Sequence, residues 1–345
     1  MNSSIILESK GKYVLDYISS GLDVDSVTSI VQKNTDEFNI KNLRQSDLTL
    51  FVNINRINEV RDVNRLLAAV NEKLVTGGVF IGCIETLEER RKRLLKKYPP
   101  VINVFYYLID FLVKRVLSKL YLTRRLYMFI TADRNKALSK AEILGRLVFC
   151  GFSIEDVTEV NNNLYFKVKK ISSPNSGKRP SYGSLFSMGR IGHHGKRITV
   201  FKIRTMHRYA EYIQEYVYKE NKLSKGGKFK DDSRITNWGA LLRALWIDEL
   251  PMIINLLIGQ LKLVGVRPLS EHYLKLYSEN LQEKRSQYKP GLIPPFYADL
   301  PETLEEIMAS ENKYLDSYSE APLKTVISYF FKALNNIIFN RARSH

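Results

Sequence analysis

The sequence has little cysteine. Two residues among 345, Cys83 and Cys150, both lie within apolar runs. Two cysteines cannot supply the disulfide framework of a small secreted domain, and their separation matches no metal-ligand spacing. We therefore predict two buried, free thiols in a reducing compartment.

Long hydrophobic runs are also missing. No run reaches the roughly 18 apolar residues that a membrane-spanning helix needs. The N-terminus shows no basic segment followed by an apolar one, so the sequence predicts no signal peptide. We expect a chain that is cytoplasmic or lies on the cytoplasmic face of a membrane.

Acidic residues are scarce relative to basic ones. The sequence has 53 Lys and Arg against 36 Asp and Glu, a formal net charge of +17, and no acid at all between Val160 and Ala210. Such an excess predicts an anionic partner: nucleic acid, phosphorylated small molecules or an anionic membrane surface. Because no nucleic-acid-binding motif or stacking platform accompanies the charge, we expect no nucleic-acid partner.

The length favours two domains. The segment SSPNSGKRPSYG, which ends at Gly183, is rich in Ser, Pro and Gly and is typical of a linker. We predict an α/β domain over residues 1–172, a linker over 173–183 and a second, mixed and helix-rich domain over 184–345.

Short apolar segments alternate with helical ones in the first domain, which predicts a parallel α/β layer. The expected strands are Leu48–Ile54, Val79–Ile84 and the pair Phe152–Val160 and Asn163–Lys170, and the expected helices are Val63–Lys73 and Lys140–Cys150, the latter capped by Ser139.

The phrases LLAAVNEKLVTGGVFIGCIE, ILGRLVFCGFSIEDV and LYFKVKK resemble the C-terminal half of a class I methyltransferase domain, which is Rossmann-like. Such a domain should carry a glycine-rich loop after its first strand, but only SGLDVDS stands there. We expect a degenerate scaffold, with retained binding of S-adenosylmethionine as the alternative.

An insertion at residues 99–131 interrupts this domain. Its apolar part, Val101–Val113, is too short to span a bilayer and is followed by basic residues mixed with Leu, Tyr and Phe. Such a basic amphipathic segment suits a bilayer interface, where its cations would meet lipid phosphates. Packing against the next domain is the alternative.

In the second domain, Arg197–Ile203 alternates as a strand. Side chains two residues apart on a strand point the same way, so Lys202 and Arg204 should project from one face. A cationic pair there could clamp a phosphate, with a solvated edge strand as the alternative.

Two adjacent carboxylates, Asp248 and Glu249, lie between apolar segments. The helix expected at Thr236–Trp246 precedes them, with Trp238, Leu241, Leu242 and Leu245 toward the core, and Pro251 opens a second helix, Met252–Ile258. An acid at a helix start is kept ionised by the helix dipole and could attack a bound phosphoryl group. A plain helix cap, worth about 1 kcal/mol, is the alternative.

The wider pattern resembles the bacterial sugar transferases, also called monotopic phosphoglycosyl transferases or polyprenyl-phosphate hexose-1-phosphate transferases. It comprises MGRIGHHGKRITVFKIRTM, then DDSRITNWGALLRALWIDELPMIINLLIGQLKLVGVRPL, then YKPGLIPPF, and covers close to a third of the chain. The resemblance implies transfer of a sugar 1-phosphate from a nucleotide sugar, usually a UDP-sugar, to a membrane polyprenyl phosphate, which starts surface polysaccharide or glycan synthesis at the cytoplasmic face of the inner membrane.

The family motifs map onto individual residues. Asp-Glu-Leu-Pro begins at Asp248, which the resemblance makes the nucleophile, with Glu249 tied to metal or to the lipid phosphate and Mg²⁺ as cofactor held by both acids. The remaining motif residues are expected to bind substrate: Lys202, Arg204, Arg243, Arg267 and Lys289. The family's Pro-Arg-Pro reads Val266-Arg267-Pro268 here, so its first proline is lost.

A larger departure lies upstream. The family carries a kinked re-entrant membrane helix before the glycine-framed block, where this sequence has the polar linker and NLYFKVKK. Candidates for a replacement anchor are residues 99–131 and Thr325–Arg343, with core packing as the alternative for both. A catalytically inactive, membrane-associated scaffold protein of a polysaccharide assembly system is the competing function.

Overall fold

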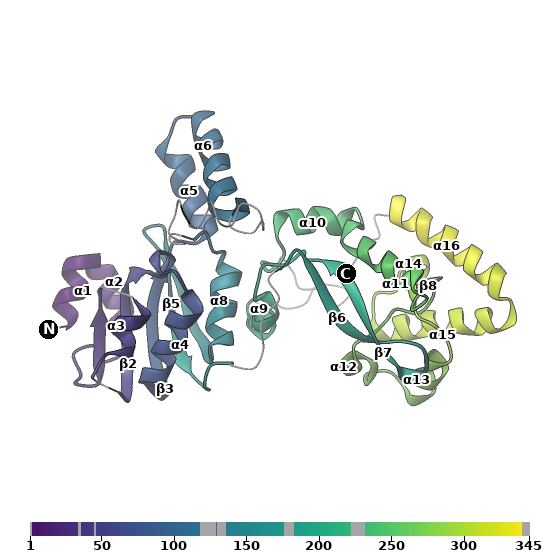
Figure 1. The fold of residues 1–345 in the computed structure, drawn as a ribbon, viewed down its shortest axis with the longest axis horizontal. Coiled ribbons are helices and arrows are strands. Elements are labelled where there is room, and N and C mark those ends of the chain that lie inside the picture. The colour runs from purple at the N-terminus through teal and green to yellow at the C-terminus, as the bar shows by residue number, and fades with distance from the viewer. Residues whose placement is uncertain are drawn as a thin grey trace. The chain divides into compact units, whose positions relative to one another are not determined.

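The computed structural model describes residues 2–33, 36–44, 46–117, 129, 136–175, 183–221 and 232–339. The chain forms two compact units (Figure 1). The first comprises Met1–Pro180 with Arg208–Tyr216, and the second comprises Ser181–His207 with Val217–His345. The predicted boundary therefore needs one correction, because residues 208–216 pack with the first unit. Part of the expected linker, residues 176–182, lies outside the described residues.

The first unit is an α/β sandwich built on a five-stranded sheet of order β1-β2-β3-β5-β4. Its strands are β1 (Ser29–Gln32), β2 (Leu48–Arg56), β3 (Leu74–Ile84), β4 (Phe152–Val160) and β5 (Asn163–Lys170). The first three strands run parallel, and β5 is antiparallel to both β3 and β4. The predicted parallel layer and the predicted strand pair are both confirmed.

The two helices predicted for this unit, Val63–Lys73 and Lys140–Cys150, are confirmed as α4 and α8, and further helices accompany them. The helices are α1 (Asn2–Lys10), α2 (Lys12–Ser19), α3 (Glu37–Lys41), α4 (Val63–Lys73), α5 (Leu87–Lys97), α6 (Ile102–Phe111) and α8 (Lys140–Phe149), with short turns η1 (Ile57–Glu59) and η4 (Ala210–Ile213) and a π-helical segment η2 (Leu112–Leu117). Ser139 caps α8 by accepting from the Glu142 N–H, as expected.

Four phenylalanines form the centre of this core. Phe80 packs against Phe51, Phe152 and Phe166, with ring centroids 5.3–5.9 Å apart. The predicted buried thiols are confirmed: Cys83 and Cys150 are almost fully covered, and burial raises their pKa values to about 11 and about 12. At neutral pH both are therefore unreactive thiols.

Segment 208–216 joins the first unit by packing closely on α8. A Cβ on Gly145 would lie 2.1 Å from the carbonyl oxygen of Tyr209, so only glycine fits there. The Tyr209 ring packs edge-on against Phe149, and its hydroxyl accepts from Asn64 Nδ2 at 2.6 Å. These contacts are long-range, which is why the sequence did not indicate them.

Replacing Gly145 with alanine is expected to lower the free energy of unfolding by about 1–3 kcal/mol, because the new methyl group forces α8 away from buried backbone. Urea unfolding followed by circular dichroism measures the change. Gly189→Ala is the matched control, because nothing lies within 4 Å of that Cβ position. Equal stability of the two variants would contradict the tight packing of α8 on segment 208–216.

The second unit is helix-rich with two small sheets. Its strands are β6 (Leu185–Ile191), β7 (Arg197–Ile203), β8 (Lys262–Val264) and β9 (Gly291–Ile293). Its helices are α9 (Gln214–Asn221, whose first residues lie in the first unit), α10 (Asn237–Ala244), α11 (Ile253–Leu257), α12 (Glu271–Leu274), α13 (Glu279–Ser286), α14 (Phe296–Asp299), α15 (Leu304–Glu320) and α16 (Pro322–Ile338), with turns η3 (His193–Gly195) and η5 (Ile247–Met252).

The β6–β7 hairpin and the parallel pair β8–β9 support the second unit together with α13, α15 and α16. Its largest core cluster includes Tyr277, Tyr314 and Tyr329, and the Tyr314 hydroxyl donates to the Val264 carbonyl at 2.9 Å. The predicted strand Arg197–Ile203 is confirmed.

The prediction that the bulky apolar side chains of α10, the helix before the acids, face the core is wrong. Trp238, Leu241 and Leu245 are 68%, 47% and 58% exposed, and Leu242 is only half-buried. Gly239 is the residue that faces inward, because a Cβ there would lie 1.9 Å from the Thr205 carbonyl oxygen. The close approach of backbones leaves no space for bulky side chains on that face, so they point outward.

The two candidate membrane anchors, residues 99–131 and Thr325–Arg343, differ in how much of their described part is buried. In the described part of residues 99–131, α6 buries none of its residues; residues 118–128 and 130–131 lie outside the described residues. α16 buries Thr325, Tyr329 and Ala333 and leaves Ile327 and Phe331 exposed. No helix in the described ranges is both long and apolar enough to cross a membrane.

Candidate active site

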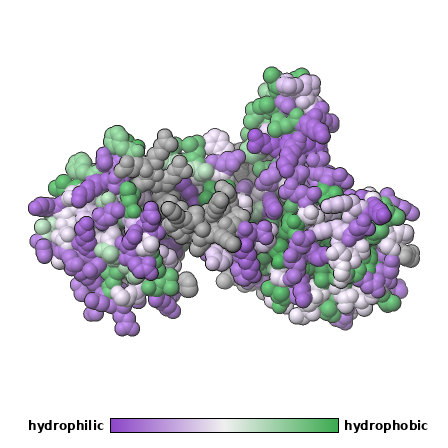
Figure 2. Space-filling model, turned by 180° about the vertical axis from the view of Figure 1, so that it is seen from behind, coloured by the Kyte–Doolittle hydropathy of each residue, from purple (hydrophilic) through white to green (hydrophobic). Residues whose placement is uncertain are grey.

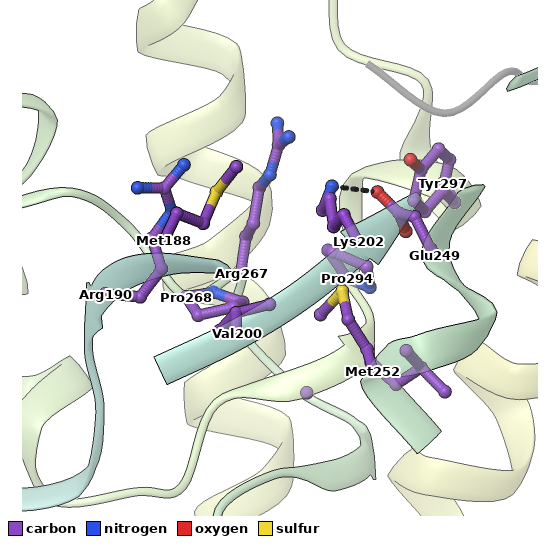
Figure 3. A pocket seen from close by; sticks show the side chains of 12 residues that line it. Met188, Arg190, Val200, Lys202, Glu249, Met252, Arg267, Pro268, Pro294 and Tyr297 are labelled. Atoms are coloured by element: carbon purple, nitrogen blue, oxygen red, sulfur yellow. Dashed lines mark hydrogen bonds and ion pairs between the residues drawn. The ribbon is translucent and has the colours of Figure 1, made fainter. Parts of the chain in front are cut away.

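One face of the β6–β7 hairpin forms the floor of a cleft. Met188 pairs with Val200 in the antiparallel register, and Arg190 and Lys202 lie two residues further along their strands on the same face. Figure 3 shows the heads of Arg190, Arg267 and Lys202 pointing to the same side of this floor. The cleft is completed by Glu249, Met252, Pro268, Gly291, Leu292, Pro294 and Tyr297.

The acids lie at the first turn of a helix, as predicted. Trp246 adopts a left-handed backbone (φ 61°), and the helix starts at Ile247 as the 3₁₀ turn η5, which continues into α11. The start is therefore earlier than the expected Met252, with Pro251 inside the turn. The Trp246 ring packs on Tyr297 at 4.3 Å between centroids, which fixes the bend.

Both carboxylates are buried, Asp248 to 4% exposure and Glu249 to 6%. Glu249 Oε1 accepts from Lys202 Nζ at 2.5 Å, an ion pair whose side chains are 14% and 7% exposed. Burial lowers the pKa of Lys202, and the charges of Glu249 and Asp248 oppose that fall. Two buried acids are thus compensated by a cation from the hairpin.

A second cation reaches the acids from α10. Arg243 Nε donates to the Thr205 hydroxyl at 2.9 Å, and Thr205 also accepts at its carbonyl from the Thr236 N–H at 2.9 Å. Burial lowers the pKa of Arg243, while Asp248 is the strongest of the charges that oppose this. Arg243, on the helix before the acids, is therefore electrostatically coupled to Asp248.

Two further arginines supply the positive charge of the cleft. Burial and the neighbouring charge of Arg267 lower the pKa of Arg190. Like charges held this close repel each other, so an anion bound between them would relieve the repulsion. Arg267 also lies over the Phe296 ring at 5.7 Å, which orients its planar head.

The structure brings together most of the predicted site residues. Lys202, Glu249 and Arg267 line the cleft, and Asp248 and Arg243 are electrostatically coupled to them. Arg204 is not among the lining residues: it follows the end of β7, donates to the Gly183 carbonyl at 3.1 Å and lies over the Phe186 ring. Lys289 is exposed, with its amine beside Gly259.

Arg190 and Tyr297 also line the cleft, and neither was predicted as a site residue. The signal for Arg190 was its position in the acid-free stretch, but only the register of β6 against β7 places it on the same face as Lys202. Tyr297 gave no signal in the sequence, since it comes from α14, almost fifty residues after the acids.

The carboxylates of Asp248 and Glu249 offer oxygen donors of the kind that Mg²⁺ prefers. Over the described ranges of the chain, no group of three or more His, Cys, Asp or Glu side chains could hold a metal by itself. Mg²⁺ is often bound by one or two carboxylates, with phosphate oxygens and water completing its octahedron. Asp248 and Glu249 have the right donor chemistry for that arrangement.

A comparison with known protein families finds a match over the part of the chain that contains this site. The family model for bacterial sugar transferases matches residues 177–338, which include both acids and all the cations of the cleft. We call residues 177–338, which are similar to this family, the sugar transferase domain.

Curated proteins named as sugar transferases or sugar phosphate transferases are similar to part of this chain. The uncharacterized sugar transferase EpsL of Bacillus subtilis is 43% identical over 108 residues, 31% of this chain and 47% of that protein. The UDP-glucose:undecaprenyl-phosphate glucose-1-phosphate transferase of Caulobacter vibrioides is 34% identical over 111 residues, 32% of this chain and 38% of that protein. The chain thus spans about half the length of EpsL and less than half the length of the Caulobacter vibrioides protein.

The chain is also similar to solved methyltransferase structures. One is a SAM-dependent methyltransferase from Thermotoga maritima, with a TM-score of 0.25 and 16% identity over 41% of this chain and 64% of that one. The α/β architecture of the first unit rests on its own sheet topology.

Proposed function

We propose that the sugar transferase domain moves a sugar 1-phosphate from a UDP-sugar to a polyprenyl phosphate through a covalent intermediate on Asp248. The Asp248 carboxylate attacks the phosphorus that carries the sugar, the bond from that phosphorus to the bridging oxygen breaks, and UMP leaves with the electron pair. An oxygen of polyprenyl phosphate then attacks the same phosphorus and releases Asp248, which gives a polyprenyl diphosphate sugar.

The observation that carries this proposal is the buried acid pair facing convergent cations. Arg190 and Arg267 would bind the diphosphate of the donor, since Arg presents a planar fork to phosphate oxygens. Lys202 holds Glu249 at 2.5 Å, and Arg243 directs its charge at Asp248. Cations placed in this way would offset the negative charge that gathers around the phosphoryl group when Asp248 attacks it.

Mg²⁺, when bound by Asp248 and Glu249 together with donor phosphates, would offset the charge that develops on the phosphoryl oxygens. The name of the Caulobacter vibrioides relative, a UDP-glucose:undecaprenyl-phosphate glucose-1-phosphate transferase, supports the donor and acceptor classes. The reaction would begin surface polysaccharide or glycan synthesis at the cytoplasmic face of the inner membrane.

An exposed apolar surface beside the acids supports a lipid acceptor. It is formed by one side of α10, by η5 and by α11, with Trp238, Leu241, Leu245, Leu250, Ile253, Ile254, Leu257 and Ile258 all at least 41% exposed. Apolar surface of this kind marks a membrane or partner contact. Because the acids belong to η5 itself, docking of this surface on a bilayer would bring a lipid phosphate near Asp248.

The test of the proposed function is transfer of label from UDP-sugars that carry ³²P in the β-phosphate to polyprenyl phosphate in the presence of Mg²⁺, with release of UMP measured alongside. A panel of UDP-sugars identifies the donor. If no UDP-sugar gives turnover while the protein still binds vesicles, the chain is a non-catalytic scaffold.

Replacing Arg190 with glutamine is expected to raise the KM for the UDP-sugar about tenfold, with a smaller effect on kcat, because one charge-assisted contact to the diphosphate is lost. Initial rates against donor concentration measure this. Arg197→Gln is the matched control on the same hairpin, since that side chain is 77% exposed and pairs with Glu271. An unchanged KM in Arg190→Gln would remove Arg190 from the donor site.

A further inference from the structure

The α5–α6 hairpin of the first unit has an inverted polarity. In a helical hairpin of a soluble protein, apolar side chains face the partner helix and polar ones face water. Here the two polar side chains of α6 turn inward: Asp110 accepts from Arg90 at 2.6 and 2.7 Å, and Asn103 Nδ2 donates to the Leu95 carbonyl at 2.8 Å. The charge of Asp110 is thereby paired with that of Arg90, on the side of α6 away from its outer face.

The outer face of α6 is apolar and broad. Ile102, Val104, Phe105, Leu108, Ile109 and Leu112 are 47–66% exposed, and α6 has no buried residue. At about 100° per residue these positions cover nearly half of the helix circumference, centred opposite Asn103 and Asp110. A helix that meets another protein helix uses a narrower stripe, so the breadth of this face suits a bilayer interface.

Cations lie on the same hairpin as this apolar face. Lys96 and Lys97 are exposed in the last turn of α5, and Lys97 Nζ lies 5.2 Å from the centre of the Tyr98 ring. Arg91 lies 5.8 Å from the centre of the Tyr107 ring. Lysine and arginine beside tyrosine are typical of the headgroup layer, where the cations meet lipid phosphates. Figure 2 shows hydrophobic and hydrophilic side chains together on the projecting hairpin.

We propose that the α5–α6 hairpin docks in the interface of an anionic bilayer, with the outer face of α6 among the acyl chains and Lys96 and Lys97 at the lipid phosphates. This contact belongs to the methyltransferase-like unit and does not depend on the chemistry at Asp248. It gives that unit a membrane-binding role with no need for a bound cofactor.

A fluorescent probe on the full-length chain tests the proposal. The native thiols are buried with raised pKa values, so a cysteine introduced by Phe105→Cys can be labelled selectively with an environment-sensitive dye. Phe105 is 66% exposed, so the substitution should not disturb folding. Phe38→Cys, at a 72% exposed phenylalanine of the same unit, is the matched control.

With vesicles of phosphatidylcholine and phosphatidylglycerol, dye emission at position 105 should rise about twofold or more and shift to the blue, because the dye leaves water. Emission at position 38 should not change. No response at position 105, or a response that grows with protein concentration without vesicles, which would indicate a second copy, overturns the proposal. An equal response to phosphatidylcholine alone overturns the role of Lys96 and Lys97.

Discussion

Replacing Asp248 with asparagine will lower turnover by at least about 10³-fold, because loss of a nucleophile removes the covalent route and leaves only substrate binding. The amide has nearly the shape of the carboxylate, so packing around this 4% exposed side chain should be kept. An amide oxygen carries no full negative charge, and it cannot form the acyl phosphate that the proposed mechanism needs.

The measurement has two parts. Wild-type protein incubated with the UDP-sugar that gives turnover, labelled with ³²P in the β-phosphate and without polyprenyl phosphate, should become labelled and release one UMP per labelled site, whereas Asp248→Asn should stay unlabelled. Asp316→Asn is the matched control, because that side chain is 57% exposed and pairs with Lys284 on the surface. If Asp248→Asn turned over as fast as wild type, the covalent mechanism would be wrong.

Replacing Lys202 with methionine will destabilise the fold and impair the reaction together. The substitution keeps the length of the side chain but leaves Glu249, only 6% exposed, without the cation that it contacts at 2.5 Å. Breaking one side of a buried ion pair typically costs about 3–5 kcal/mol, because the remaining charge is poorly solvated. We expect a loss in unfolding free energy toward the lower end of that range and at least about a hundredfold loss of kcat.

A companion variant separates stability from catalysis. Lys202→Met combined with Glu249→Gln removes both charges, so urea unfolding should recover most of the lost stability. Activity should not recover, because the double variant has neither the cation nor the second acid. Recovery of activity together with stability would show that the Lys202–Glu249 pair is only structural.

Much of the first unit could be read from the residues. Apolar runs such as Leu48–Ile54 and Val79–Ile84 are long enough and β-branched enough to specify buried strands, and Ser139 stands where a helix needs a cap. These signals are local, so tertiary packing had little to override. The packing of residues 208–216 on Gly145 depends instead on a contact over more than sixty positions, which no local pattern contains.

The candidate site was predicted only in part, because some of its residues are marked by local patterns and others are brought together by long-range contacts. The position of Asp248 and Glu249 at a helix start follows from Pro251 and the flanking apolar segments, and the family motif supplied Arg243 and Arg267. Arg190 needed the strand register, and the outward face of α10 needed the close approach of Gly239 to Thr205. Helical periodicity identifies an apolar face but not whether it meets a core or a membrane.

The sequence by itself determined the alternation of strands and helices, the burial of the thiols, and the presence of two acids and a set of cations in one ordered motif. Only the tertiary structure decided which cations converge, which apolar helices stay uncovered, and where one unit ends. The physical reason is that propensity and periodicity act over a few residues, whereas ion pairs such as Lys202–Glu249 join side chains that the chain order keeps far apart.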